Sequence, residues 1–332
     1  MRIGDAEKTT GRAGRLLRAL LAVLVVAAVV VPLVAAARPD IPAPAPAART
    51  AWTAGTLEKT YAANRSNAEL ASEMARDNGD RHRAAADSAL AAPGRHLLSF
   101  DGRGDGRATE VLGDLAHAHR IAILVPGSDT TLDTYARFRA GADALYRRLT
   151  REAPAGTGVA VIAWLGYTTP DTISTTVLTP DRADEAAPEL RAFVAGLRAL
   201  TGPDTHLSLL CHSYGTVVCA RAAARLDADE LVLLGSPGTG ADSASGLGTR
   251  ARVWAARGAD DWVADVPHTS ADLFGTTIGF GRDPVSPAFG AQVFAAGDGG
   301  HSDYFTPGSV SLANLARIVL GESTEVTRAQ DT

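Results

Sequence analysis

The sequence predicts an α/β fold in which helices cover both faces of a mostly parallel central sheet. From about residue 96 onward, short apolar runs alternate with longer segments that have the helical repeat. Each apolar run is continuous rather than alternating, as is typical of parallel strands that are buried on both faces. The composition also fits a globular protein, with 46% hydrophobic and 21% charged residues in a chain of 332.

The N-terminal region predicts membrane targeting. Residues 1–18 are basic, and residues 19–37 contain no charged side chain. A helix over 19–37 would rise about 28 Å, close to the hydrocarbon thickness of a bilayer. Small residues at 35–37 also suit a cleaved signal peptide, so a signal-anchor and a signal peptide both stay open. In either case the basic flank stays in the cytoplasm and the rest is exported, as a single-pass membrane protein or as a secreted one.

The next two segments predict a spacer and a helical extension. Residues 38–49 contain four Pro and favour an extended linker. Residues 50–95 are rich in Ala, and the stretch 56–91 contains no Pro, which favours helices broken near Asn78-Gly79. A β-hairpin is then expected where two apolar runs flank a turn rich in Gly. Those runs are residues 95–100 and 108–112.

The remaining strands and helices follow from apolar runs and from the Asp, Gly and Pro residues that start and stop helices. Predicted strands cover residues 121–125, 159–164, 206–210, 231–234, 252–256 and 292–295. Predicted helices cover residues 135–151, 183–200, 216–226 and 309–320. These elements define one α/β domain over residues 96–322, followed by a disordered tail at 323–332.

Charge and composition exclude several classes of function. The net charge is −5, and residues 50–332 carry −9, so no basic surface for nucleic acid is expected. Neither Lys8 nor Lys59 lies in a glycine-rich phosphate loop, and no spacing of ligand residues indicates a metal. We therefore expect no cofactor and no metal. Cys211 and Cys219 lie eight residues apart around one predicted helix, which favours two reduced thiols over a bridge.

The strongest catalytic signal is Cys211-His212-Ser213-Tyr214-Gly215, between the predicted strand 206–210 and the helix 216–226. In a nucleophile elbow, a strand stops, the chain turns tightly and a serine hydroxyl is raised above the carboxyl edge of the sheet. The flanking positions need small side chains, and Cys211 stands where Gly is usual. Ser213 is therefore the candidate nucleophile.

A serine hydroxyl needs a base to take its proton, and a carboxylate to orient that base. His268 and His301 follow Ser213 in the sequence. His301 comes after the last predicted strand, in a loop rich in Gly, and is the candidate base. His268 precedes that strand and is interpreted as a surface residue.

The candidate acid follows the strand 252–256, where Asp260 and Asp261 are adjacent. Asp261 is favoured by its place in an Asp-x-Val loop, and Asp260 remains the alternative. Asp242 is a more distant candidate. Donors for an oxyanion are expected from the backbone N–H groups of Tyr214 and Ser128.

The chain from about residue 96 resembles the α/β-hydrolase superfamily, and more narrowly an actinobacterial α/β-hydrolase family formerly classed as a domain of unknown function. The phrases that carry the resemblance include VPGSDTTLDTYA (125–136), HLSLLCHSYGT (206–216), VWAARGADDW (253–262) and FGAQVFAAGDGGHSDYF (289–305). The resemblance implies Ser213 as nucleophile, Asp261 or Asp260 as acid and His301 as base.

The expected function is that of an exported serine hydrolase that cleaves carboxylic ester bonds through an acyl-enzyme. Its expected partners are a small-molecule or lipid ester and, through the N-terminal helix, a membrane. Two alternatives stay open. One is an acyltransferase that uses a cell-envelope acceptor, and the other is a non-catalytic envelope-binding protein with the same fold.

Overall fold

The computed structural model describes residues 41–48, 50–172, 174, 177, 179–266, 271–273 and 276–329. Residues 42–332 form one compact unit. The basic region 1–18 and the apolar segment 19–37, on which the membrane prediction depends, lie outside the described residues. Among the residues that are described, no helix is both long enough and apolar enough to span a bilayer.

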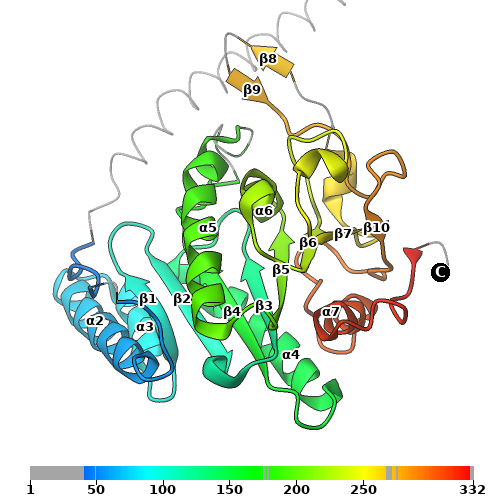
Figure 1. The fold of residues 1–332 in the computed structure, drawn as a ribbon. Helices are drawn as coiled ribbons and strands as arrows, with labels where there is room; N and C mark the ends of the chain where they lie inside the picture. Colours follow the sequence, from blue (N-terminus) through cyan, green and yellow to red (C-terminus); the bar gives the residue numbers. More distant parts are fainter. Residues whose placement is uncertain are drawn as a thin grey trace, which may run out of the picture. The chain divides into compact units, whose positions relative to one another are not determined.

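Within the described residues, eight strands form the central sheet in the order β1-β2-β4-β3-β5-β6-β7-β10 (Figure 1). The strands are His96–Asp101 (β1), Arg107–Gly113 (β2), Arg120–Val125 (β3), Val159–Leu165 (β4), His206–His212 (β5), Glu230–Leu234 (β6), Arg252–Ala256 (β7) and Gln292–Val293 (β10). The β1–β2 and β2–β4 pairs are antiparallel, and the pairs from β4 to β10 are parallel. The sheet is therefore mostly parallel, as the sequence predicts.

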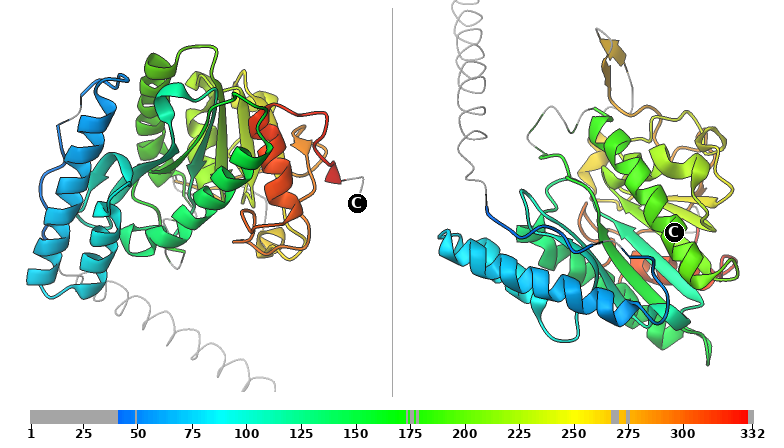
Figure 2. Two further views of the ribbon diagram at one scale, coloured as in Figure 1. Left: turned by 90° about the horizontal axis from the view of Figure 1, so that it is seen from below. Right: turned by 60° about the vertical axis from the view of Figure 1, so that its left-hand side comes forward.

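Helices cover both faces of this sheet (Figure 2). On one face lie α5 (Asp181–Thr201) and α6 (Gly215–Ala222), and on the other lie α4 (Tyr135–Glu152) and α7 (Val310–Leu320). Each face buries its own apolar cluster, so side chains of one strand contribute to both. In β5, for example, Leu209 packs in the α5–α6 cluster and Leu210 in the α4–α7 cluster. This double burial explains why the strand sequences are continuously apolar.

The N-terminal helices α2 (Leu57–Asp77) and α3 (Arg81–Ala91) cover the β1 edge of the sheet (Figure 1). Arg83 on α3 is 2% exposed and donates to the carbonyl oxygens of Gly102 and Gly104, at 3.0 and 2.9 Å. Its guanidinium also forms an ion pair with Asp133, at 2.9 Å. Asp133 follows the loop after β3, so the N-terminal helices are held against the loop that carries Ser128, one of the two candidate oxyanion donors.

Short 3-10 helices and a small hairpin complete the described elements. The 3-10 helices are Leu115–His117, Leu132–Thr134, Ala223–Arg225, Ser245–Leu247 and Trp262–Asp265. β8 (Ala271–Leu273) and β9 (Thr276–Ile278) pair in an antiparallel hairpin that the sequence does not predict. Each of these strands spans three residues, too short for a pattern to emerge. The helix predicted over 216–226 ends earlier, because α6 tightens into a 3-10 turn after Ala222.

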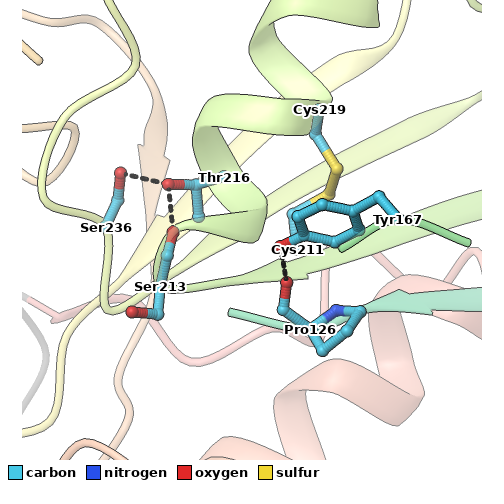
Figure 3. The surroundings of a disulfide bond; sticks show 7 residues. All are labelled: Pro126, Tyr167, Cys211, Ser213, Thr216, Cys219 and Ser236. Atoms are coloured by element: carbon cyan, nitrogen blue, oxygen red, sulfur yellow. Dashed lines mark hydrogen bonds between the residues drawn. A yellow bond between two sulfur atoms is a disulfide. The ribbon is translucent and has the colours of Figure 1, made fainter. Parts of the chain in front are cut away.

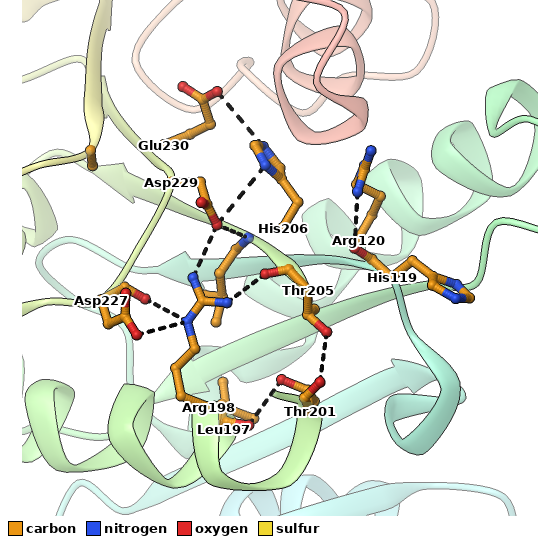
Figure 4. Close-up of polar contacts among 12 residues, drawn as sticks. His119, Arg120, Leu197, Arg198, Thr201, Thr205, His206, Asp227, Asp229 and Glu230 are labelled. Atoms are coloured by element: carbon orange, nitrogen blue, oxygen red, sulfur yellow. Dashed lines mark hydrogen bonds and ion pairs between the residues drawn. The ribbon is translucent and has the colours of Figure 1, made fainter. Parts of the chain in front are cut away.

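A polar cluster fixes the amino-terminal end of β5, opposite the end that carries Ser213 (Figure 4). Arg198 on α5 donates to the backbone carbonyl of Asp227 at 2.9 Å and to the Asp229 carboxylate at 3.0 Å. The same carboxylate accepts the backbone N–H of Leu207 at 2.7 Å. These contacts tie α5 to the beginnings of β5 and β6, and so position the strand that leads to the candidate nucleophile.

Candidate active site

Ser213 occupies a strained turn between β5 and α6. Its φ of +53° lies in the left-handed region, which costs a residue with a side chain on the order of 1–3 kcal/mol. The turn is held by the backbone N–H of Ser213, which donates to the carbonyl of Leu234 at 2.9 Å. The local geometry is therefore that of the nucleophile elbow that the sequence predicts.

The elbow also depends on the close approach of the loop after β3. A Cβ added to Gly127 would lie 2.6 Å from the Cβ of Ser213. On the other side of the elbow, a Cβ added to Gly215 would lie 2.5 Å from the carbonyl oxygen of Pro126. Real Cβ atoms do not approach other heavy atoms this closely, so glycine at both positions allows the loop to pass beside the serine.

The structure brings together Ser213, His301 and Asp261. The Nε2 atom of His301 lies 2.9 Å from Ser213 Oγ, and its Nδ1 atom lies 2.8 Å from Asp261 Oδ1. Asp261 follows β7, and His301 lies in the loop between β10 and α7. The three residues thus follow three different strands of the sheet, and they occur in the chain in the order serine, aspartate, histidine that is typical of this topology.

The Asp261 carboxylate is 1% exposed and is surrounded by donors. It accepts hydrogen bonds from Tyr304 Oη at 2.5 Å and from the backbone N–H of Val263 at 2.9 Å, as well as from His301. Burial acts to raise the pKa of Asp261, but the hydrogen bonds from His301, Tyr304 and Val263 outweigh it and hold the pKa below its usual value. This carboxylate is therefore ionised when it orients the imidazole.

The other sequence candidates have different surroundings. Asp260 is exposed, although it precedes Asp261 directly, and Asp242 is exposed in the loop after β6. His268 lies outside the described residues. Among the carboxylates considered in the sequence, Asp261 is the one that contacts His301.

Tyr304 and His212 also belong to the site, and the sequence reasoning missed both. Tyr304 Oη accepts the backbone N–H of Gly258 at 3.2 Å while it donates to Asp261. His212 Nε2 lies 2.6 Å from the carbonyl oxygen of His301, and the two rings are 4.6 Å apart. Tyr304 could have been suspected from its position three residues after His301, and His212 from its position before the elbow serine.

His212 acts as a neutral donor to the loop of His301. Burial and, to a smaller extent, the neighbouring His301 ring lower the pKa of His212 to about 4. A neutral imidazole carries one N–H group, and the short contact to the His301 carbonyl assigns that proton to Nε2. His212 therefore fixes the backbone of the candidate base without carrying a competing charge.

Gly235, the residue after β6, packs closely against Asp261 and His301. Its φ is +52°, and a Cβ at this position would lie 2.7 Å from Asp261 Oδ2 and 3.1 Å from His301 Nδ1. A side chain here would displace the hydrogen bond between the two residues. The close packing explains why this position is occupied by glycine.

The two candidate oxyanion donors lie beside Ser213 in the same cavity lining. Within the part of the chain that the structure describes, neither the Ser128 N–H nor the Tyr214 N–H donates to another protein group. The loop that carries Ser128 is anchored from the β4–α5 connection. Asp129, with a φ of +56°, donates its N–H to the carbonyl of Pro170 at 3.1 Å and accepts the N–H of Thr172 at 2.9 Å.

A cavity of about 1120 Å³ opens onto Ser213 and His301. Its lining is largely apolar and includes the end of β3 and the loop after it, one side of α4, the elbow after β5, the loop after β7 and the loop before α7. Among the described residues, no group of His, Cys, Asp and Glu could hold a metal ion.

The prediction of two reduced thiols is wrong, because Cys211 and Cys219 form a disulfide (Figure 3). Their Cα atoms lie 6.5 Å apart, within the range that a disulfide can span. The elbow turns the chain back on itself, so the end of β5 lies beside the second turn of α6. The prediction interprets the eight-residue spacing as distance along one helix, and that interpretation leaves out the reversal of the chain at the elbow. Both cysteines are buried in the apolar cluster on the α5–α6 side of the sheet. The Cys211 side chain, which is larger than the Gly usual at this position of an elbow, is accommodated there.

Comparison with known proteins finds one matching family model and several relatives. A family model described as Alpha/beta hydrolase matches residues 101–271. Rv2079, an uncharacterized protein of Mycobacterium tuberculosis, is 32% identical over 256 residues, which cover 68% of this chain and 39% of the relative. Rv0963c, another uncharacterized protein of that organism, is 33% identical over 177 residues, covering 50% of this chain and 66% of the relative. The chain thus spans about two fifths of the first relative and just under two thirds of the second.

Solved structures with similar architecture include hydrolases. A serine hydrolase without a lid from Xanthomonas campestris is 18% identical, with a TM-score of 0.42, and the match covers 69% of this chain and 94% of that one. Esterase PE8 is 18% identical, with a TM-score of 0.40, covering 63% of this chain and 95% of that one.

Proposed function

Because this chain belongs to the alpha/beta hydrolase family, we propose that it is a serine hydrolase that cleaves carboxylic ester bonds through an acyl-enzyme. The observation that carries the proposal is the hydrogen-bonded series from Ser213 through His301 to Asp261. A nucleophile, a base and an orienting acid within hydrogen-bonding distance form the arrangement that acyl transfer requires.

In the first half of the proposed reaction, Ser213 Oγ attacks the carbonyl carbon of the ester while His301 Nε2 takes the hydroxyl proton. The carbonyl oxygen becomes an oxyanion, which the N–H groups of Ser128 and Tyr214 stabilise. When the tetrahedral intermediate collapses, the carbon–oxygen bond to the alcohol breaks and His301 returns the proton to the departing alcohol oxygen. Ser213 is then acylated.

In the second half, water replaces the alcohol. His301 removes a proton from the water while the water oxygen attacks the acyl carbon. When the new intermediate collapses, the bond between the acyl carbon and Ser213 Oγ breaks and His301 returns the proton to Oγ, which gives a carboxylic acid and free Ser213. Asp261 stays ionised throughout and stabilises the imidazolium that forms twice in each cycle. Tyr304 and the Val263 N–H support this role, because they hold the carboxylate in place.

We further propose that the α/β domain lies outside the cytoplasm, and that residues 19–37 direct it there. The apolar character of that segment and the basic residues before it support this orientation. The Cys211–Cys219 disulfide supports it independently, since disulfides persist in oxidising compartments. Fractionation of cells that express the full chain, with thiol alkylation before lysis, tests this location. A cytoplasmic chain with two free thiols would refute it.

The function is tested by labelling the purified full-length chain with a fluorophosphonate probe, which reacts with activated serines. We expect the wild type to be labelled, and Ser213→Ala and His301→Ala to lose labelling. His117→Ala is the matched control, since His117 is an exposed histidine on a 3-10 helix far along the chain from the site. A folded wild type without labelling would refute the hydrolase and favour a binding protein.

Product analysis then separates hydrolysis from transfer. With an ester substrate alone, hydrolysis gives one free acid for each alcohol released. If an added alcohol or sugar acceptor captures most of the acyl group, the chain is an acyltransferase that uses the same residues. Acid release that is unchanged by acceptors supports hydrolysis.

A further inference from the structure

The cavity beside Ser213 extends a long way over α4. Thr134, the residue before α4, and Ala144, ten residues later, both line it. At 1.5 Å per residue, the cavity therefore follows the helix for about 15 Å. Leu124 of β3 and Leu210 of β5 form its floor, and both are buried.

The walls of this stretch are mostly apolar, with Thr134 and Thr306 exposed at its margins. On α4 they are formed by Phe138, Gly141 and Ala144, and the facing loop contributes Phe305 and Pro307. The charged side chain that reaches this stretch, Arg137, is exposed at its rim. The side chains of Phe138, Ala144 and Phe305 offer no hydrogen-bonding group. A polar group held between them would lose its hydrogen bonds to water, so this part of the stretch favours an apolar ligand.

Small residues on α4 set the width of the stretch. A Cβ at Gly141 would lie 3.3 Å from Phe305, so even one added methyl group at this position would press on the facing ring. Ala144 lies almost one turn further along the same side of the helix. Larger residues at either position would narrow the space beside Phe305.

The position of His301 indicates where the alcohol part and the acyl part of a bound ester would lie. The alcohol must leave toward His301 Nε2, because that atom returns its proton. The His301 ring packs against Trp262, with ring centroids 4.6 Å apart, and Trp262 is 52% exposed. Trp262 and Val263 line the same cavity, but the exposure of Trp262 opens this side to solvent and suits it to a departing alcohol, whereas the apolar stretch along α4 is left for the acyl group.

We propose that the stretch lined by Leu124, Phe138, Gly141, Ala144 and Phe305 binds the acyl chain, and that the substrates are esters of long apolar acids. This inference rests on the serine-hydrolase function proposed above. It adds the class of acid, and it assigns α4 as the element that sets the accepted chain length.

The test measures kcat/KM of the full-length chain with a series of p-nitrophenyl esters from acetyl to palmitoyl. We expect wild type to prefer long chains and Ala144→Leu to lower the palmitoyl-to-acetyl ratio about tenfold or more, because a filled cavity excludes the chain. Ala136→Leu is the matched control. It makes the same change on α4 at an exposed residue that does not line the cavity, so its ratio should equal that of wild type.

Several results would overturn the assignment. A flat chain-length profile in wild type, or an unchanged ratio in Ala144→Leu, removes the acyl chain from α4. A second series, acetate esters of alcohols of increasing length, should be insensitive to Ala144→Leu, and sensitivity there would mean that the alcohol occupies the stretch. If Ala144→Leu does not fold, Gly141→Ala makes a smaller change in the same space and carries the same expectation.

Fluorophosphonate labelling separates this inference from the proposed function. Labelling of wild type together with a flat profile refutes the acyl-chain assignment alone. Absence of labelling refutes the hydrolase, and a fluorescent fatty acid is then titrated into wild type and Ala144→Leu. Binding that weakens in Ala144→Leu would retain the chain-binding stretch in a protein without turnover, and equal or absent binding would remove it.

Discussion

Asp87 makes the stability of this protein depend on pH. It lies on α3 with 1% exposure, and within the described residues its Oδ1 atom has no hydrogen-bond partner. The pKa of Asp87 is raised from 3.8 to about 7, chiefly by burial. The charge of Arg83 opposes this rise, and those of Asp133 and Asp80 add to it.

The sign follows from proton binding. Because the folded state holds the Asp87 proton more tightly than the unfolded chain, folding takes up a proton between about pH 4 and pH 7, and stability falls as the pH rises through that window. At 1.36 kcal/mol for each tenfold difference in proton affinity, the whole effect is at most about 4 kcal/mol. Roughly 2–3 kcal/mol of it is lost between pH 5 and pH 8.

We therefore predict that Asp87→Asn flattens the pH dependence of stability. The free energy of unfolding, measured by urea denaturation at pH 5 and pH 8, should change by about 2–3 kcal/mol less in the variant than in wild type. Asp77→Asn, at an exposed carboxylate on α2, is the control and should follow wild type. Parallel curves for wild type and Asp87→Asn would refute the reasoning, because they would mean that Asp87 ionises as easily in the fold as in the unfolded chain.

Further predictions concern the site. Asp261→Asn should lower the fluorophosphonate labelling rate by up to about 10⁴-fold, as expected for the acid of such a triad, while Asp260→Asn should label normally; the reverse order would exchange their roles. Tyr304→Phe should lower the free energy of unfolding by about 1–3 kcal/mol, measured by urea denaturation, because two buried groups lose their hydrogen-bond partner, and an unchanged midpoint would contradict this. Gly127→Ala should lose labelling with an intact circular dichroism spectrum, since its Cβ would collide with the nucleophile; normal labelling would show that the loop can move aside. Cys219→Ala should cost about 2–3 kcal/mol of unfolding free energy, as estimated from the short loop that the disulfide closes, and equal melting of wild type with and without reductant would argue against that value.

Much of the fold could be predicted because its signals are local. The strands at 121–125 and 206–210 are continuously apolar, and each is followed by turn residues and a helical pattern. β8 and β9 could not be predicted, because three-residue strands have no measurable period. The predicted strand 292–295 is reduced to two residues paired with β7 in β10, and the next residue, Phe294, forms an antiparallel bridge with Arg328 near the end of the described chain, which no local pattern indicates.

The sequence indicates those residues of the candidate site whose positions follow from chain order and from the residues that form turns. Ser213 and His301 were named because one follows a central strand and the other follows the last. The sequence could not choose firmly between Asp260 and Asp261, because adjacent residues have the same local signals and differ in the direction of their side chains. The disulfide depends on three-dimensional proximity that no spacing in the sequence indicates, and the role of Tyr304 depends on the direction in which its side chain points.

Gly127 and Gly235 have a consequence for how mutational data on this protein should be interpreted. Neither residue has a functional group, yet any side chain at these positions would collide with Ser213, Asp261 or His301. In a saturation screen for activity, both should tolerate as few replacements as the nucleophile itself. Such a screen would not distinguish residues that are needed for space from residues that take part in the reaction. A catalytic role therefore needs chemical evidence such as probe labelling. For the same reason, glycines at these two positions should be useful markers, together with the serine motif, for relatives that retain this geometry.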